Sequence, residues 1–419
     1  MKKVSLFTPS HNSKFLDGCY GSLLAQTHTN WQWVVYLNGG ADWQVPNDSR
    51  VVVERTSKSF GVGRAKQEAV ELCSGEILIE LDHDDLLMPT AIEKTVRAFE
   101  ENPDAVFVYS DFQQVKEDGT PDSRPFNEAF GWRYDGERII SFLPTPSAVS
   151  YIWYGPNHIR AFTRTAYDAI GGYDEKMFVL DDQDLYCRLY QIGNFVHIPE
   201  MLYKQRSHAE NTQSESSLNS QIQKETVELY DRYVEGNALA WAKRSDLLSL
   251  DLGGAHNSPD GYLSVDQYEP ADLVGDIFEV LGNLADNSVG VIRAVDFMEH
   301  IPDKIGLMNE LYRVLAHGGM LLSLTPSTDG RGAFQDPTHV SYWNENSFWY
   351  YTDHQYAKYV PEIICRFQVS RLVSLFPSDW HRENSIPYVR ANLVAVKNGP
   401  RLPGLLNWPT DEESSATTR

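Results

Sequence analysis

The stretch "ILIELDHDDLLMP", Ile77–Pro89, runs an apolar segment directly into three aspartates, Asp82, Asp84 and Asp85. The apolar segment predicts a buried strand, and acidic residues commonly form the turn where a strand ends. In an open α/β sheet, ligands bind beyond the carboxyl ends of the strands. The spacing of Asp82 and Asp84 lets their carboxylates converge, and a hard divalent cation would offset the repulsion between them. Taken alone, the same pattern also fits a solvated turn.

The sequence around this stretch alternates between two patterns over residues 1–110. Strand candidates rich in Val, Ile and aromatic residues lie at 3–9, 31–38, 50–56, 76–81 and 105–111, and segments of helical spacing lie at 14–28, 62–74 and 89–103. This alternation predicts βαβ units and a mostly parallel sheet. Residues 111–160 lack a clear period and are rich in Pro, Gly and aromatic residues, so we expect them to cover a substrate.

A second α/β pattern follows. Its strand candidates lie at 246–254, 261–269, 289–296 and 318–326, and a helix at 303–319 is expected to stop at Gly318. The sequence therefore predicts an α/β protein with two domains, each built on its own Rossmann-like sheet. The expected boundaries are 1–213 for the first domain, 214–245 for a helical linker, 246–400 for the second domain and 401–419 for a flexible tail.

Composition limits the possible partners. The 419 residues contain 36 Lys and Arg against 58 Asp and Glu, which gives a formal charge of −22. Such a surface disfavours binding to a nucleic-acid backbone and polybasic attachment to a membrane. The four cysteines form no CxxC pair, and neither a signal peptide nor an apolar run of spanning length is present. We therefore expect a cytoplasmic protein with reduced thiols and no integral membrane segment.

Four motifs of the first half occur in a recognisable order. They are "VSLFTPSHNSKFLDGCYGSLLAQTHTNWQWVVYLNGG", "SFGVGRAKQEAVELCSGEILIELDHDD", "IGGYDEKMFVLDDQDLYCRLYQIG" and "LYKQRSHAENTQS". Together they resemble the inverting glycosyltransferases of family two, which have the GT-A fold, and the resemblance covers about residues 1–235. It implies transfer of a sugar from a nucleotide-diphosphate donor, a UDP- or GDP-sugar, with Mn²⁺ or Mg²⁺ at the leaving phosphate.

The resemblance implies a role for individual residues. Asp84 would be the principal metal ligand, His208 a distal ligand, and Asp82 would contact the ribose or the metal. The remaining donor-side residues would be Thr8, Pro9, His11 and Asn12 at the base and ribose, Asn38 where the family commonly has Asp, and Lys66 at the diphosphate. Asp85 could simply finish the turn, and Lys66 could equally be a solvated helix charge.

Inversion by direct displacement also needs a base for the acceptor hydroxyl. The sequence "LDDQDL" supplies Asp181 and Asp182, and the motif position favours Asp182. An acidic residue at the start of the helix that follows would serve as a cap, and both roles are compatible. Aromatic residues of the segment 111–160 could form an acceptor platform, or they could simply pack in the core; they are Trp132, Trp153, Tyr154 and His158.

The second half carries "LLSLDLGGAHNSPDGYLSVDQYE", a strand, a glycine turn and an acid after the next strand. This stretch and its sequel resemble class I S-adenosylmethionine-dependent methyltransferases over about residues 246–398. The resemblance implies a donor site made by Asp251, Gly253, Gly254, Asp266, Asp276 and Asp296. The usual D-x-G-x-G-x-G reads D-L-G-G-A-H-N here, so a domain that no longer binds the donor is the alternative.

Methylation of a sugar hydroxyl needs a base, a metal or both. The candidates are His339 and Asp336 in "DPTH" and Glu299 and His300 in "MEHI", although such sequences also cap turns and helices. The expected function is therefore bifunctional: transfer of a sugar and methylation of a sugar, with a glycan, glycosylated protein or lipid as acceptor. The alternatives are a glycosyltransferase with an inactive acceptor-docking domain, and a non-catalytic glycan-binding scaffold.

Overall fold

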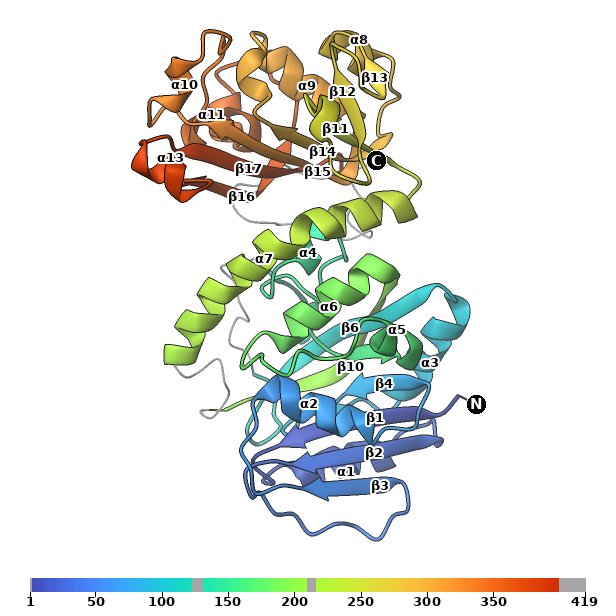
Figure 1. The fold of residues 1–419 in the computed structure, drawn as a ribbon. Helices are drawn as coiled ribbons and strands as arrows, with labels where there is room; N and C mark the ends of the chain where they lie inside the picture. Colours follow the sequence, from blue (N-terminus) through green and yellow to red (C-terminus); the bar gives the residue numbers. More distant parts are fainter. Residues whose placement is uncertain (1, 123–130, 209–215, 399–419) are drawn as a thin grey trace. The chain divides into compact units, whose positions relative to one another are not determined.

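The computed structural model describes residues 2–122, 131–208 and 216–398. The chain forms two compact units: Met1–Pro144 with Ala148–Val234, and Thr145–Ser147 with the chain from Glu235 onward. Each unit has its own mixed α/β sheet with helices packed on it (Figure 1). The expected fold class, α/β with two Rossmann-like units, is confirmed. The expected tail 401–419 lies outside the described residues.

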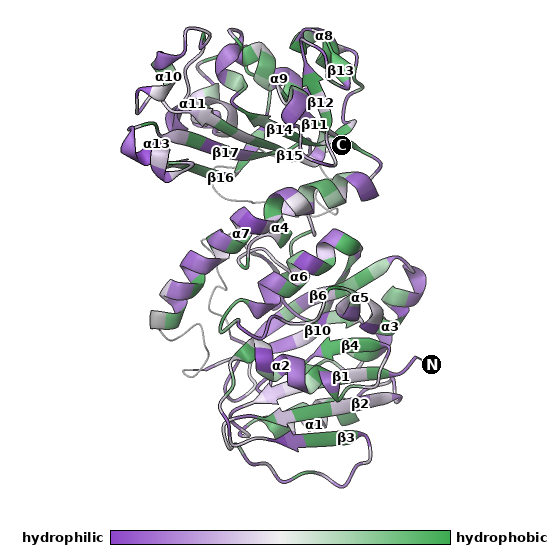
Figure 2. Ribbon diagram, viewed as in Figure 1, coloured by the Kyte–Doolittle hydropathy of each residue, from purple (hydrophilic) through white to green (hydrophobic). Residues whose placement is uncertain are grey.

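The sheet of the first unit has the strand order β3-β2-β1-β4-β9-β6-β10-β5, with the hairpin β7–β8 attached to β6. Its strands are β1 (Val4–Ser10), β2 (Trp31–Leu37), β3 (Val51–Arg55), β4 (Ile77–Glu80), β5 (Leu86–Leu87), β6 (Ala105–Lys116), β7 (Arg133–Asp135), β8 (Arg138–Ile140), β9 (Arg160–Thr163) and β10 (Asn194–Ser207). Strands β1 to β4 pair in parallel, and β9 and β5 pair antiparallel with their neighbours. Strand β4 is largely hydrophobic in Figure 2, as expected for a sheet covered on both faces.

The helices up to residue 244 are α1 (Leu16–Leu24), α2 (Val62–Glu71), α3 (Ala91–Glu101), α4 (Pro146–Val149), α5 (Arg164–Ala169), α6 (Asp181–Ile192) and α7 (Ser216–Arg244). The division between the two units falls within α4 and within α7. Helix α3 buries Ile92, Val96 and Phe99, which share one helix face, and prolines before and after it limit its length. Helix α2 covers β1 and β2 (Figure 1). Since the chain runs from β1 to β2 on one side and returns to β4 on the other, the topological switch point lies between β1 and β4.

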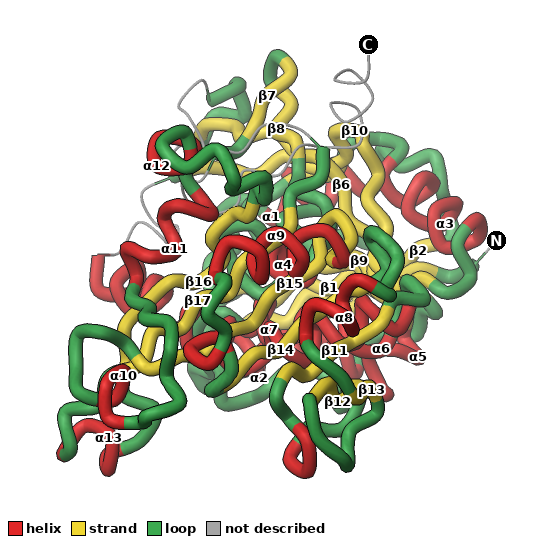
Figure 3. Tube along the Cα trace, turned by 90° about the horizontal axis from the view of Figure 1, so that it is seen from above, coloured by secondary structure: helices red, strands yellow, loops and turns green. Residues whose placement is uncertain are grey.

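The segment 111–160 is more regular than its sequence suggests. Strand β6 continues to Lys116 because β10 pairs with it along almost its whole length. Strands β7 and β8 then form a short antiparallel hairpin (Figure 3). Trp132, Tyr154 and His158 are buried, so the packing alternative holds for these three side chains.

The sheet of the second unit has the order β13-β12-β11-β14-β15-β17-β16. Its strands are β11 (Leu248–Leu252), β12 (Leu263–Asp266), β13 (Leu273–Val274), β14 (Val289–Val295), β15 (Leu315–Pro326), β16 (Phe367–Leu375) and β17 (Tyr388–Ala395), and its helices are α8 (Ile277–Gly282), α9 (Lys304–Val314), α10 (Gly332–Gln335), α11 (Glu345–Thr352), α12 (His354–Ala357) and α13 (Asp379–Glu383). The first five strands are parallel, and β17 runs antiparallel between β15 and β16. Figure 3 shows α11 beside β16 and β17. The described fold of this unit thus ends in an antiparallel pair of strands.

One boundary in this unit differs from expectation. Helix α9 ends at Val314 rather than at Gly318, because Leu315 is already paired with Val289 of β14 and is fully buried. Gly318 instead has a φ of +90° inside β15, where the strand is irregular. Sheet pairing therefore takes over at Leu315, three residues before the glycine that was expected to end the helix.

Helix α7 is the expected connecting helix, but the two compact units divide at Val234 within it. The last part of the helix belongs to the second unit. There the hydroxyl of Tyr262 donates to Glu235 Oε1 at 3.0 Å, and a Cβ added to Gly290 would lie 2.5 Å from Ala242 Cβ. Among the described residues, no helix combines the length and the apolar character that crossing a bilayer requires.

Candidate functional site

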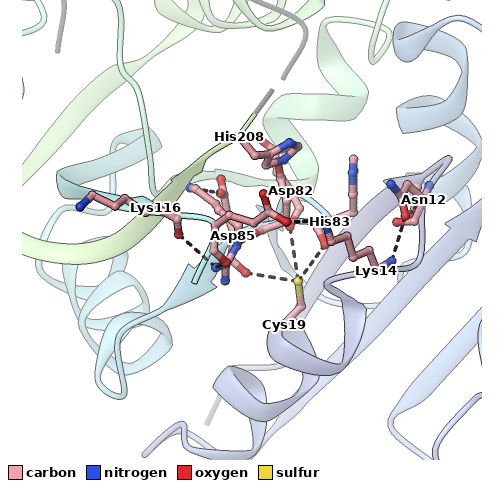
Figure 4. A network of polar contacts seen from close by, with 12 residues as sticks. Asn12, Lys14, Cys19, Asp82, His83, Asp85, Lys116 and His208 are labelled. Atoms are coloured by element: carbon pink, nitrogen blue, oxygen red, sulfur yellow. Dashed lines mark hydrogen bonds and ion pairs between the residues drawn. The ribbon is translucent and has the colours of Figure 1, made fainter. Parts of the chain in front are cut away.

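The acidic turn follows β4 at the switch point, and Figure 4 shows it with the side chains around it. Arg206 of β10 holds the turn from one side: its Nε donates to the Asp84 carbonyl at 2.7 Å and its backbone N–H to Asp85 Oδ1 at 2.6 Å. The buried thiol of Cys19 on α1 lies on another side, 3.2 Å from the Asp85 carbonyl and 3.3 Å from the His83 carbonyl. The turn is therefore fixed by two neighbouring elements.

Asp84 and His208 are brought together although 124 residues separate them in the sequence. Asp84 Oδ2 lies 2.8 Å from His208 Nε2, and both side chains are largely buried. The ring of Phe15 packs 5.4 Å from the His208 ring. A carboxylate oxygen and an imidazole nitrogen therefore face each other beside the turn.

Asp82 lies with Asp85 and His158 rather than with Asp84. One ligating atom from each of Asp82, Asp85 and His158 lies within 4.8 Å of those of the other two. Asp82 Oδ2 is 3.4 Å from His158 Nε2, and Nδ1 of His158 is buried without a hydrogen-bond partner among the described residues. Burial and the nearby Glu80 carboxylate raise the pKa of Asp82 to about 7, although the side chain keeps 35% of its surface exposed, which moderates the effect of burial.

Asp85 does more than end the turn. Its side chain is buried and accepts the Arg206 backbone N–H. Burial and the carboxylates of Asp84 and Asp82 raise the pKa of Asp85 well above the ordinary value for an aspartate. Three carboxyl groups thus crowd one turn, so their charges repel each other unless protons or a cation intervene.

A buried chain of ion pairs runs behind the turn. Lys66 of α2 pairs with Glu80 at 2.8 Å and with Asp181 at 2.7 Å, and Arg160 of β9 pairs with Glu80 at 3.3 Å. Burial disfavours the lysine cation, yet these carboxylates together raise the pKa of Lys66 above its ordinary value. Lys66 is therefore neither a solvated helix charge nor open to a diphosphate: it neutralises two buried carboxylates.

Asp182 is more exposed than Asp181 in the motif LDDQDL. It pairs with Arg160 at 2.9 Å and its side chain is 17% exposed, whereas that of Asp181 is 6% exposed. Both residues lie in the first turn of α6, which begins at Asp181 after Leu180 in a left-handed conformation. The helix therefore includes both aspartates instead of following them, and Asp182 is held by a charged partner as well as by the helix start.

The residues expected at the base and ribose lie at the ends of β1 and β2. Thr8 is buried, and its hydroxyl donates to the Leu81 carbonyl at 2.7 Å. Asn12 accepts the Lys14 backbone N–H at 3.0 Å and, like Pro9, is partly exposed. Asn38 exchanges two hydrogen bonds of 2.9 Å with the Phe60 backbone, so its amide fixes the loop after β3.

In the second unit, Asp251 supports the glycine turn from inside. Its carboxylate is fully buried, accepts Arg293 Nη1 at 2.8 Å and accepts the Ser258 hydroxyl at 2.8 Å. A Cβ at Gly254 would lie 2.1 Å from this carboxylate, and Gly253 has a φ of +74°, so both positions require glycine. The turn is therefore kept open by glycine although Ala255 and Asn257 replace the later glycines of the motif.

The other acids expected at the donor lie at the carboxyl ends of the same strands. Asp266 ends β12 and accepts the Tyr268 N–H at 3.0 Å, and Asp276 caps α8 by accepting the Phe278 N–H at 2.9 Å. Asp296 follows β14 and is exposed. The three acids thus lie at the edge of the sheet where nucleotides bind in related folds.

The residues expected on the methyl-acceptor side also come together. Ligating atoms of Glu299, His300 and His339 lie within 4.8 Å of one another. Asp336 is exposed and accepts the N–H of Thr338 at 2.8 Å and its hydroxyl at 2.6 Å, so it shapes the turn that carries His339. Burial raises the pKa of Glu299 to about 8.

Sequence reasoning missed Glu80, Arg160 and Arg206. Glu80 had a signal, because a charged residue inside the apolar run "ILIEL" must find a buried partner. Arg160 had none, since it lies in a segment without a clear period. Arg206 stands in a quoted motif, but its contacts with the Asp84 carbonyl, the Asp85 carboxylate and the Glu117 carbonyl depend on the pairing of β10 with β5 and β6.

Two family models match this chain. Residues 5–170 match the model described as Glycosyl transferase family 2, and residues 256–323 match one described as Methyltransferase domain. The chain therefore carries a domain of each transferase class, one in each unit, as the sequence motifs predicted.

Relatives match the first unit. A chondroitin synthase of Escherichia coli is 29% identical over 220 residues, covering 50% of this chain and 29% of the relative. A chondroitin synthase of Pasteurella multocida (strain Pm70) is 26% identical over 218 residues, covering 50% of this chain and 21% of the relative. The chain thus spans less than a third of the length of these relatives. The crystal structure of S. aureus TarS 1-349 in complex with UDP-GlcNAc matches with a TM-score of 0.42 and 12% identity, covering 58% of this chain and 72% of that one.

Proposed function

We propose that the first unit transfers a sugar, with inversion, from a nucleotide-diphosphate donor bound with a divalent cation. The observation that carries the proposal is the facing pair of Asp84 and His208, 2.8 Å apart beside the switch point of a family-two domain. The second unit would methylate a sugar hydroxyl with S-adenosylmethionine.

The side chains that would act as metal ligands in the first unit suit a divalent cation. Asp84 and His208 would be its ligands, and Asp82 would lie on the ribose or reach the cation from the side of His158. The orphaned Nδ1 of buried His158 and the crowding of three carboxyl groups indicate that this region is built for a positively charged ligand. The cation would stabilise the negative charge that develops on the leaving diphosphate.

Asp182 would take the proton of the acceptor hydroxyl. Arg160 fixes its carboxylate, and the start of α6 fixes its backbone, so the group is oriented while part of its surface stays open. Asp181 cannot share this role, because Lys66 covers it and it is closed to solvent. A single displacement with Asp182 as base would invert the configuration at the transferred sugar.

In the second unit the open glycine turn supports donor binding. Gly253 and Gly254 let the backbone approach a ligand, and Asp266, Asp276 and Asp296 lie along the same sheet edge. A nucleoside with ribose hydroxyls suits such acids. We infer that both units modify one glycan because they are fused in a single chain. The relatives are named chondroitin synthases, and this favours a polysaccharide as the acceptor.

The transferase proposal is tested with a panel of nucleotide sugars and Mn²⁺, scored by release of the nucleoside diphosphate. We expect Asp84→Asn and Asp182→Asn each to lower the rate at least about 100-fold. Asp104→Asn, an exposed acid on the same unit, is the matched control and should keep the wild-type rate. Unchanged turnover in Asp84→Asn, or full activity in a chelator, would show that the cation mechanism is wrong.

The methyltransferase proposal competes with an inactive docking domain, which the altered glycine motif favours. Calorimetry with S-adenosylhomocysteine on the whole chain separates the two, since a docking domain would give no heat of binding. We expect binding in the wild type and its loss in Gly253→Val, whose side chain would meet Phe297 in a backbone conformation that favours glycine.

A further inference from the structure

Glu299, His300 and His339 form a cluster on the carboxyl side of the second sheet. Glu299 and His300 lie in a single 3-10 turn, Met298–His300, directly after β14. His339 lies in the loop after α10, and the N–H groups of Val340 and Ser341 both donate to the Glu299 carbonyl at 2.9 Å. Two segments forty residues apart in the sequence are therefore tied together where parallel strands place ligands.

Both imidazoles are oriented as metal-binding histidines usually are. Nδ1 of His339 lies 3.2 Å from the Ala333 carbonyl, and Nδ1 of His300 lies 3.2 Å from the Thr338 carbonyl. A carbonyl oxygen only accepts, so each Nδ1 carries the proton and each Nε2 keeps its lone pair. Such a backbone contact is the usual partner of a histidine that binds a metal through its other nitrogen.

Glu299 supplies the independent sign of a ligand. Its side chain is 1% exposed, and neither carboxylate oxygen has a hydrogen-bond partner among the described residues. The imidazole of His339 comes closest to forming an ion pair with this carboxylate, and its Nε2 lies 3.9 Å from Glu299 Oε1. A buried carboxyl group without hydrogen bonds is costly, so its retention needs a reason.

We propose that Glu299, His300 and His339 bind a divalent transition-metal ion through one carboxylate oxygen and two imidazole nitrogens. Two ligands of a zinc ion stand about 3.4 Å apart, so the cluster would close around the ion with small side-chain movements. Two imidazoles favour zinc, iron or nickel over magnesium, calcium or manganese, which prefer oxygen ligands. Three protein ligands leave coordination positions open, as in catalytic rather than structural sites.

The role of the ion rests on the proposed methyl transfer, whereas its binding does not. An acceptor hydroxyl in an open position would bind through oxygen and lose its proton more easily to water or a buffer base. The oxygen would then form a bond with the methyl carbon, and the sulfonium sulfur would keep the electron pair of the bond that breaks. Asp336 would position this site through Thr338, whose carbonyl orients His300.

The test is metal content after dialysis of the whole chain against Zn²⁺, combined with titration of Co²⁺ followed by visible absorption. We expect Glu299→Gln and His339→Gln each to lose one equivalent of metal or to weaken binding at least about 100-fold. His354→Gln and Glu383→Gln, exposed residues of the same unit, are the matched controls and should behave as wild type. Asp84→Asn should keep the equivalent of metal that depends on Glu299, because Asp84 belongs to the first unit and Glu299 to the second.

Two further measurements distinguish a loss of metal binding from a loss of folding. Without metal, Glu299→Gln should unfold at or above the wild-type temperature, because a neutral amide replaces a buried acid; added Zn²⁺ should raise the unfolding temperature of the wild type alone. Equal metal content in wild type and both variants would overturn the proposal, as would a metal-free wild type. If S-adenosylhomocysteine fails to bind while zinc still binds through Glu299, the methyltransferase proposal fails and the metal site stands.

Discussion

Glu80 is an acid inside the buried strand β4, where Lys66 and Arg160 both contact its carboxylate. Burial opposes its ionisation, but these two cations prevail and lower its pKa to about 2. Asp84 and His208 could be anticipated because ordered motifs imply them. Glu80 could be suspected from its apolar neighbours, but its partners come from α2 and β9, and no local pattern connects these elements with β4.

Replacing Glu80 by Gln should lower the free energy of unfolding by about 3 kcal/mol at neutral pH, because buried cations lose a partner. The folded pKa lies below the unfolded value of about 4.3, so the contribution is complete above that value and is lost as the pH falls towards 2. Urea unfolding of wild type and variant between pH 7 and pH 3 measures the difference. Glu76→Gln, an exposed neighbour, is the control, and a difference that does not shrink with falling pH would contradict the prediction.

Substitution of Gly254 tests whether the buried Asp251 carboxylate supports the glycine turn after β11. A Cβ there would lie 2.1 Å from Asp251 Oδ2, although the backbone φ of −72° suits any residue, so the obstacle is purely steric. We expect Gly254→Ala to cost about 2 kcal/mol of unfolding free energy through displacement of Asp251 from Arg293. Gly282→Ala, with nothing within 4 Å, should be neutral or slightly stabilising; equal effects of the two changes in urea unfolding would refute the steric argument.

At the level of elements, most helices and strands lie where periodicity predicts them, and the exceptions have tertiary causes. Strand β15 starts at Leu315 because β14 already offers a partner at Val289. Strand β6 extends to Lys116 because β10 continues alongside it. In both cases an edge formed far away in the sequence overrides the local helix or loop signal.

Two substitutions of Asp276 distinguish its role as a helix cap from a role in ligand binding. It accepts the Phe278 N–H at the start of α8, so Asp276→Ala should lower the free energy of unfolding by about 1 kcal/mol. Asp276→Ser retains a capping oxygen and should remain within a few tenths of wild type in the same urea experiment. Equal stability of the two variants would show that the cap contributes nothing. Weaker binding of S-adenosylhomocysteine by the serine variant, which keeps the cap, would assign the carboxylate to the nucleoside.

For the whole molecule, the sequence predicts two α/β units and a connecting helix, and the structure has them. What could not be predicted is where the units divide, because α7 is one continuous helix with no break at Val234. The spacing of apolar residues in α7 predicts an apolar face, but it does not predict which unit each turn of the helix packs on. Leu239 and Ala242 pack on Gly261 and Gly290, and these glycines become informative only once the sheet is assembled.

The division of α7 predicts which fragment of the second unit is stable. Residues 235–419 retain the Glu235–Tyr262 hydrogen bond and the packing of Leu239 and Ala242, whereas residues 246–419 lose all three. Because these contacts bury apolar surface against the amino-terminal ends of β12 and β14, we expect the shorter fragment to lose about 3 kcal/mol of unfolding free energy. Urea unfolding of both fragments measures the difference. Equal midpoints would mean that the helix end adds nothing to the unit, and that the boundary near residue 246 predicted from the second α/β pattern is also the energetic one.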